Sequence, residues 1–146
     1  MSLSNVFGIS GSAMSAQTVR LNTTASNLAN AESVSSSVDE TYRARKPVFA
    51  LKALTDDTGL LEPSQHDIAP GQGVEVKAIV ESDAPLRPVY NPSHPMADEA
   101  GYVYYPNVNV VEEMADMISA SRSFQVNAEI MNTAKQMMQR ALTLGQ

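Results

Sequence analysis

The chain has 146 residues, 16 acidic against 10 basic, and contains neither cysteine nor tryptophan. This length suits one domain, and the acidic balance argues against general affinity for nucleic acid or anionic membranes, because phosphates require clustered Lys and Arg. The lack of cysteine excludes disulfides and thiolate chemistry.

Residues 1–32 are expected to form a helix of small and polar residues with a thin apolar seam. Phe7, Met14, Leu21 and Leu28 recur at intervals of seven, and Arg20 is the single formal charge before residue 32. The many Gly, Ser, Thr and Asn residues lower helix stability relative to Ala. We therefore expect this helix to be weak by itself and to become ordered by packing against other helices.

The segment between the two ends of the chain is expected to contain strands and turns. A Ser-rich link at 33–41 is typical of a flexible loop, and residues 42–106 hold all eight prolines and four of the seven glycines. Strands are expected at 42–51, 73–81 and 102–106, with an extended or edge strand at 85–95. A turn at 56–59 and an exposed loop at 62–72 complete this small β-rich module.

The last segment, 107–146, predicts one long helix from about Val110, capped by Asn107 or Asn109 and followed by Gly145. Alternate steps of four and three describe a coiled-coil seam through Val110, Met114, Met117, Ser121, Phe124, Ala128, Met131, Lys135, Met138 and Leu142. Such a helix would be about 50 Å long, whereas a compact globule of this chain length is about 40 Å across. The helix therefore needs a partner.

These elements predict an α+β fold, in which two long terminal helices pair as an antiparallel coiled-coil hairpin with the β-rich module inserted between them. The methionines of the last helix can be ordinary core or an adaptable binding surface. Arg122, amid small residues, can reach a carboxylate across a helix interface or extend into solvent.

An enzyme would need a convergent site, and the sequence favours none. His66 and His94 lie in proline-rich, polar segments, and Ser93, His94 and Asp98 lack the geometry of a nucleophile elbow. No pattern of metal ligands and no cofactor-binding motif is present, so we expect neither metal nor cofactor. No apolar run is long enough to span a bilayer, and no cleavable secretory signal is expected.

Several stretches resemble the flagellar rod, hook and hook-filament axial protein family. One is Ser-Asn-Leu-Ala-Asn-Ala at 26–31, and the more specific ones are 102–114 and 118–125, followed by Asn127. Residues 73–76, 83–85 and 90–95 match the middle segment of proximal-rod members. The resemblance covers nearly the whole chain, and the short length suits the proximal rod better than the distal rod or hook.

The resemblance implies a structural subunit whose terminal helices form the inner coiled-coil layer of a tubular, torque-transmitting rod through which exported subunits pass. It also implies export without a cleavable signal by the flagellar type III apparatus and assembly in the periplasm. Implied partners are copies of itself, the other proximal- and distal-rod proteins, and the adaptor at the export gate and MS ring, with no nucleic acid and no membrane insertion. The expected assembly contacts are Phe7, Met14, Leu21, Asn27, Leu28, Asn30, Val110, Met114, Met117, Ile118, Ser121, Arg122, Phe124, Asn127, Ala128, Met131, Met138 and Leu142.

A second function remains open from the sequence. A helical hairpin that folds by itself could serve as a binding or adaptor module of the flagellar export system. Such a module would be a compact monomer or dimer, whereas a rod subunit would complete its folding only between neighbours.

Overall fold

A computed structural model describes the backbone of residues 3–52 and 73–144. Two long helices, α1 (Leu3–Ala29) and α2 (Val110–Leu144), enclose four strands in the sequence: β1 (Arg45–Lys52), β2 (Gly73–Glu81), β3 (Arg87–Tyr90) and β4 (Tyr102–Tyr105). The predicted α+β class and both terminal helices are confirmed. The predicted turn at 56–59, the loop at 62–72, His66 and Gly145 lie outside the described residues.

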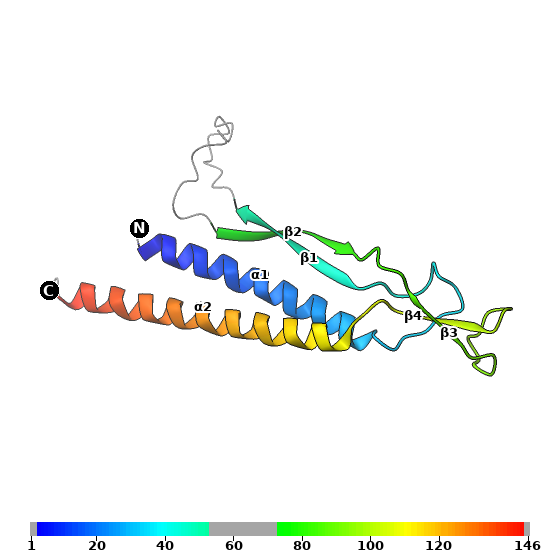
Figure 1. Cartoon of the computed structure of the whole chain (residues 1–146). Coiled ribbons are helices and arrows are strands. Elements are labelled where there is room, and N and C mark those ends of the chain that lie inside the picture. The colour runs from blue at the N-terminus through cyan, green and yellow to red at the C-terminus, as the bar shows by residue number, and fades with distance from the viewer. Residues whose placement is uncertain (1–2, 53–72, 145–146) are drawn as a thin grey trace, which may run out of the picture.

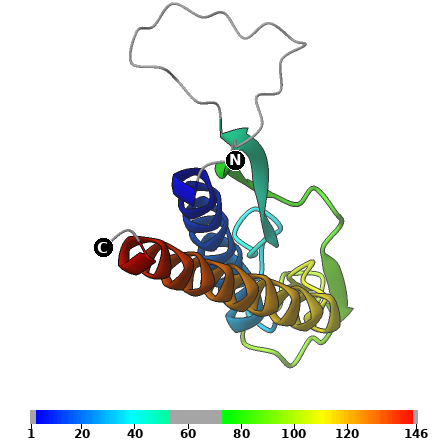
Figure 2. The ribbon, with the colours of Figure 1, turned by 90° about the vertical axis from the view of Figure 1, so that its left-hand side faces the viewer.

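The helices lie side by side and antiparallel, so that both ends of the chain are at one end of an elongated molecule (Figure 1). Seen end-on, the helices cross rather than run parallel (Figure 2). An ion pair joins the C-terminal half of α1 to the first turns of α2, because Arg20 Nη2 lies 2.6 Å from Asp116 Oδ1. Of the two candidate caps, Asn109 caps α2: its Oδ1 accepts the Val111 N–H at 3.1 Å.

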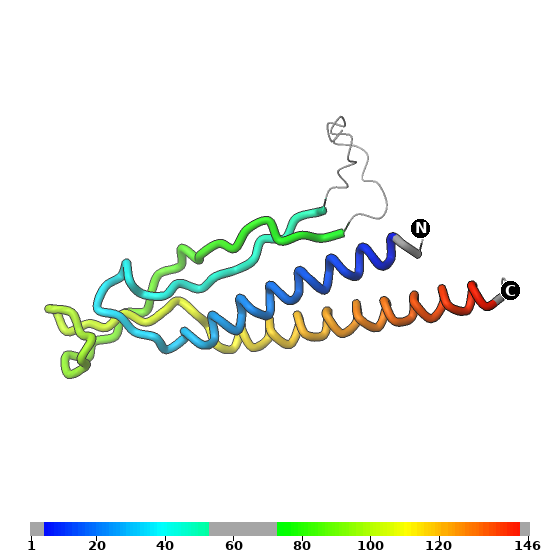
Figure 3. The backbone as a smooth tube through the Cα atoms, turned by 180° about the vertical axis from the view of Figure 1, so that it is seen from behind, coloured from blue at the N-terminus to red at the C-terminus, as the bar shows by residue number. Residues whose placement is uncertain are grey.

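The four strands form two separate antiparallel sheets, β1–β2 and β3–β4. The β1–β2 hairpin, which we call the arm, lies along α1 on the side away from α2 (Figures 1 and 3). The β3–β4 hairpin lies beyond the ends of the helices, opposite the termini. The predicted β-rich module is therefore split between the flank and the tip of the molecule, and α1 lies in the middle layer.

The Ser-rich link is packed, which corrects the expectation of a flexible loop. Ser35 forms an isolated antiparallel bridge with Tyr104 of β4, through N–H···O bonds of 3.2 and 3.0 Å. The Thr41 hydroxyl donates to the Ser37 carbonyl at 2.6 Å, and both Ser35 and Thr41 are buried. Residues at both ends of the link are thus held by hydrogen bonds, since Ser and Thr side chains readily bond nearby backbone groups.

The apolar core consists almost entirely of small side chains. Among the described residues, the buried hydrophobic positions are Ala16, Ala31, Ala44, Val103, Ala120 and Ala134. Small side chains let helices approach closely, but each buries little apolar area, and stabilisation scales with that area. The large apolar side chains of the described residues are mostly exposed or only half-buried.

Candidate assembly interface

Small and polar residues of α2 face α1. The buried positions Glu113, Ala120 and Ala134 share the spacing of seven that also includes half-buried Asn127. Half-buried Met131 belongs to the same face, since its Cε lies 3.8 Å from where a Cβ on Gly11 of α1 would be. The contact between the helices thus depends on close approach rather than on a stripe of large side chains.

This inner face coincides only in part with the predicted seam. Met117 and Met131 are half-buried, but Val110, Phe124 and Met138, at the same spacing of seven, are exposed. The alternate seam positions lie one residue beyond the inner face, as Ser121 follows buried Ala120. Met114 and Ile118 are 52% and 57% exposed. Of the remaining predicted positions on α2, Ser121, Asn127 and Ala128 are half-buried and Arg122 is exposed.

Large apolar side chains on α2 remain in contact with solvent in the single chain. They run along nearly its whole length: Val110, Val111, Met114, Ile118, Phe124, Val126, Ile130, Met137, Met138 and Leu142. Exposure is 75% at Val111 and 69% at Leu142, near the two ends of the helix. At about 100° per residue, Val111 and Ile118 point about 160° away from the buried Glu113 and Ala120, and Met114 lies toward the same side. Val126, Ile130 and Met137 lie about 80–120° from Ala120 in the opposite sense. α2 thus has two unpaired apolar flanks.

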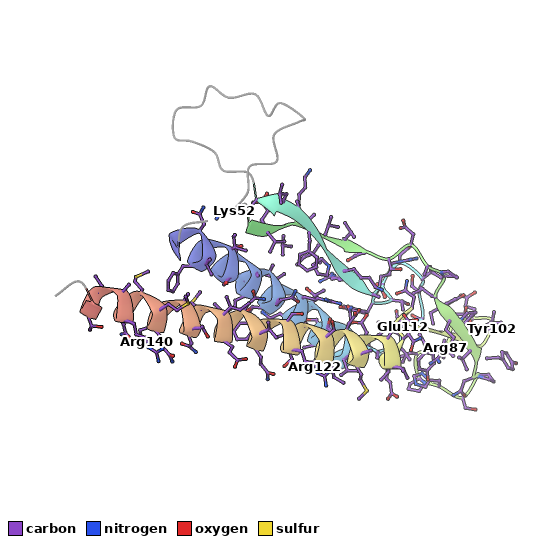
Figure 4. The ribbon with its side chains drawn as sticks, turned by 60° about the vertical axis from the view of Figure 1, so that its left-hand side comes forward. Lys52, Arg87, Tyr102, Glu112, Arg122 and Arg140 are labelled. Atoms are coloured by element: carbon purple, nitrogen blue, oxygen red, sulfur yellow. The ribbon has the colours of Figure 1, made fainter. Side chains whose placement is uncertain are left out.

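A shallow apolar groove connects the second flank to the start of α1. Val6 of α1 and Val126, Ile130, Ala134 and Met137 of α2 line it, and its volume is about 490 Å³. Exposed apolar patches of this kind are characteristic of sites that bind other proteins. Arg122 and Arg140 lie on the outer side of α2, turned away from α1 (Figure 4).

The residues predicted on α1 have two different environments. Phe7, Met14, Leu21 and Leu28 are half-buried, and each keeps apolar surface for a neighbour. Asn30, just after α1, is also half-buried, and its side chain bonds back to the helix, its Nδ2 donating to the Ser26 carbonyl at 2.8 Å. Asn27 differs from all of these: it is 1% exposed, and both of its amide groups are bonded inside the chain.

A hydrogen-bonded junction around Asn27 was not apparent from the sequence. Its Oδ1 accepts the Arg45 N–H and the Tyr42 hydroxyl, both at 2.9 Å, and its Nδ2 donates to the Arg45 carbonyl at 2.8 Å. Asn107, just before α2, accepts the Ala44 N–H at 2.7 Å. The end of α1, the start of β1 and the start of α2 therefore meet at two asparagine side chains. The partners are many residues away, so no local pattern identifies them.

The same junction changes the titration of Tyr42. Burial raises the pKa of its phenol, and the negative charges of Glu113 and Glu81 add to this effect, while Arg45 lowers the pKa. The Arg45 guanidinium lies 5.6 Å from the centre of the Tyr42 ring. Tyr42 is thus held as a neutral hydrogen-bond donor.

The residues considered for catalysis make structural contacts. His94 Nδ1 accepts the Met96 N–H at 3.1 Å, and Asp98 Oδ1 accepts the N–H groups of Ala100 and Tyr102 at 2.9 and 2.7 Å. These bonds shape the turn that leads into β4. Within 3–52 and 73–144, no three His, Asp or Glu side chains gather as a metal site would require. In the same ranges, neither helix combines the length and apolarity that a bilayer span needs.

Two family models and a set of curated proteins match this chain. Residues 7–34 match the model "Flagella basal body rod protein", and residues 99–144 match "Flagellar basal body rod FlgEFG protein C-terminal". The flagellar basal-body rod protein FlgC of Salmonella typhimurium is 50% identical over the full length of both chains. FlgC of Escherichia coli O157:H7 is 48% identical over the full length of both, and FlgC of Borreliella burgdorferi is 35% identical over 99% of this chain and 98% of its own.

The two model matches fall on the terminal helices and their flanking residues, the parts of the molecule with the unpaired apolar flanks. Identity of this size over whole chains of equal extent shows common descent. The chain belongs to the FlgC family of flagellar basal-body rod proteins.

Proposed function

We propose that the chain acts as a structural subunit of the flagellar basal-body rod, joined to its neighbours through the terminal helices. The observation that carries the proposal is the inverted distribution of side chains, with five alanines and one valine as the buried apolar core and large apolar residues exposed along α2. Burying apolar surface in water is favourable, so these side chains drive association. The relatives named above are rod proteins, which indicates the assembly in which this occurs.

In this proposal, residues 1–32 and 107–146 form the inner layer of a tubular shaft and pair as an antiparallel coiled coil. Residues 42–106 lie outside, and 33–41 link the two parts. Long helices covered on several sides give a shaft the stiffness that torque transmission requires. The two apolar flanks of α2 support this arrangement, because a helix with α1 on one side can then pack against neighbours on two others.

The partners are other rod subunits, proximal and distal, and the adaptor between the rod and the MS ring or export gate. Before assembly, the chain passes through the flagellar type III export apparatus without a cleavable signal and reaches the periplasm. The poor helix propensity of α1 and the small side chains in the core suit such a route, because weakly stable ends unfold readily. No cofactor, metal or enzymatic activity belongs to this function.

A helical reconstruction of isolated basal bodies, with this chain labelled, tests the proposal. Density for α1 and α2 in the inner layer of the rod, with the exposed residues of α2 against neighbouring subunits, is the expected result. A labelled chain that restores motility but is absent from the rod would contradict it. That result would favour the adaptor module, as would a compact monomer or dimer in sedimentation.

A further inference from the structure

The arm is fastened to α1 at two points whose separation is similar on both elements. At its base, Asn27 bonds the backbone of Arg45; at its tip, the Val74 N–H donates to Ser12 Oγ at 3.1 Å. Ser12 and Asn27 are fifteen residues apart, which is about 22 Å along a helix. Val74 pairs with Leu51, which lies six residues along β1 from Arg45, about 20 Å along a strand. The two fasteners therefore agree in register.

At the tip of the arm, β2 can approach α1 closely enough for the Val74–Ser12 bond because residue 73 is glycine. A Cβ on Gly73 would collide with the Ser12 side chain. Lys52, the last residue of β1, pairs with Gly73 across the arm. The Ser12 hydroxyl is itself oriented, because it donates to the Ile9 carbonyl at 2.8 Å. The tip of the arm can thus bond to α1 only in one alignment.

The base fastener is the more constrained of the two. Asn27 is 1% exposed, and its Oδ1 and Nδ2 together satisfy the N–H and the C=O of one residue, Arg45. A buried backbone group left without a partner costs more than an ordinary hydrogen bond gains, so loss of either bond is penalised.

Apart from these fasteners, apolar contact secures the arm only in part: Val74 and Val76 of β2 are half-buried, while the other large apolar residues of the arm are more exposed. Val48, Leu51, Ile79 and Val80 are 41%, 57%, 52% and 48% exposed. A two-stranded hairpin is at best marginally stable by itself in water. The direction of the arm therefore depends on its polar attachments to α1.

We infer that Asn27 is a positioning residue that fixes the direction and register of the arm on α1, so that arm and helix pair act as one rigid body. The inference rests on the proposed function, because the consequence is felt when neighbouring rod subunits meet both the arm and the helices. Asn27 acts there through Arg45 and the arm, and makes no contact of its own with a neighbour.

Hydrogen exchange of the Val74 amide in isolated basal bodies tests this, because its bond to Ser12 forms only when the arm is docked. Asn27→Asp keeps the acceptor but loses the donor to Arg45, and we expect Val74 to exchange about tenfold faster. Asn30→Asp is the matched control, since the Asn30 side chain bonds only the Ser26 carbonyl of α1, and it should leave Val74 unchanged. The Ala120 amide on α2 should keep its rate in all variants, whereas general loosening would accelerate it.

Tyr42→Phe provides a milder variant if the Asn27→Asp chain does not enter the rod. It removes one of the bonds to Asn27 and keeps the ring beside Arg45, so about threefold faster exchange at Val74 is expected. Unchanged exchange at Val74 in Tyr42→Phe, or equal acceleration at Ala120, would overturn the inference. Absence of the unsubstituted chain from basal bodies would instead contradict the proposed function.

Discussion

Replacing Ile118 by serine should weaken assembly without weakening the subunit. Ile118 is 57% exposed on the first apolar flank of α2. Fully burying an isoleucine stabilises by about 1.5–3 kcal/mol, so covering the exposed part would contribute about 1–2 kcal/mol. Loss of that contribution corresponds to an assembly constant about 5–30 times smaller.

The assay combines swarming of a strain that carries only the variant, recovery of the variant in basal bodies, and thermal unfolding of the purified chain. Gln125→Ser is the matched control, because Gln125 is an exposed residue of α2 seven positions further along, on the same side of the helix. It loses volume but little apolar area. Ile118→Ser should enter basal bodies less efficiently than Gln125→Ser, with unfolding of both purified chains unchanged within about 0.5 kcal/mol.

Two results would refute this reasoning. If Ile118→Ser assembled and swarmed as well as Gln125→Ser, the flank would not be covered in the rod. If it instead lowered the unfolding temperature of the purified chain by several degrees, Ile118 would contribute to the fold of the subunit and not to an interface.

Three further predictions follow from single contacts. Gly73→Ala should speed hydrogen exchange of the Val74 amide, because a Cβ at residue 73 collides with Ser12. Equal exchange rates in the variant and the unsubstituted chain would show that the tip of the arm approaches α1 less closely. Arg20→Met should lower the free energy of unfolding by at most about 1 kcal/mol, and less in high salt, since the pair with Asp116 is partly exposed; a salt-independent loss would indicate packing instead. The raised pKa of Tyr42 means that its contribution is present below the ordinary tyrosine pKa of 10.0 and lost as pH rises through the folded value, so Tyr42→Phe should flatten the alkaline loss of stability. Ionisation of the phenols can be followed by second-derivative absorbance as the pH is raised. Titration curves of the same shape for the unsubstituted and the Tyr42→Phe chain would contradict that assignment.

The helices could be predicted from the sequence because their signals are local. The apolar periodicity and the absence of proline fix α1 and α2 to within a few residues of their observed bounds. Only the choice between Asn107 and Asn109 as the cap required the structure, because both asparagines precede the first turn.

The arrangement of the strands could not be predicted, because it depends on contacts distant in sequence. Ser35 pairs with Tyr104, and Asn107 bonds Ala44, so the link and the strands are ordered by partners that no local pattern identifies. The expectation of one β-rich module did not specify how its strands pair. The structure joins them in two hairpins, one packed on α1 and one at the tip.

The candidate interface was predicted in character but not residue by residue. Large apolar residues define a seam in sequence, yet the face that packs on α1 is centred on Ala120 and Ala134, because small residues allow the closer approach. Met114 and Ile118 thereby remain exposed. Asn27 was predicted as an assembly contact, and its bonds to Arg45 show that its amide is occupied within the subunit.

Hydrogen exchange along the outer ends of the helices tests the central claim most directly. The comparison is between the purified chain and assembled basal bodies, over residues 5–16 of α1 and 126–142 of α2. If the subunit completes its fold only between neighbours, these amides exchange rapidly in the purified chain and at least a hundredfold more slowly in the rod. Strong protection in the purified chain, unchanged on assembly, would contradict the account.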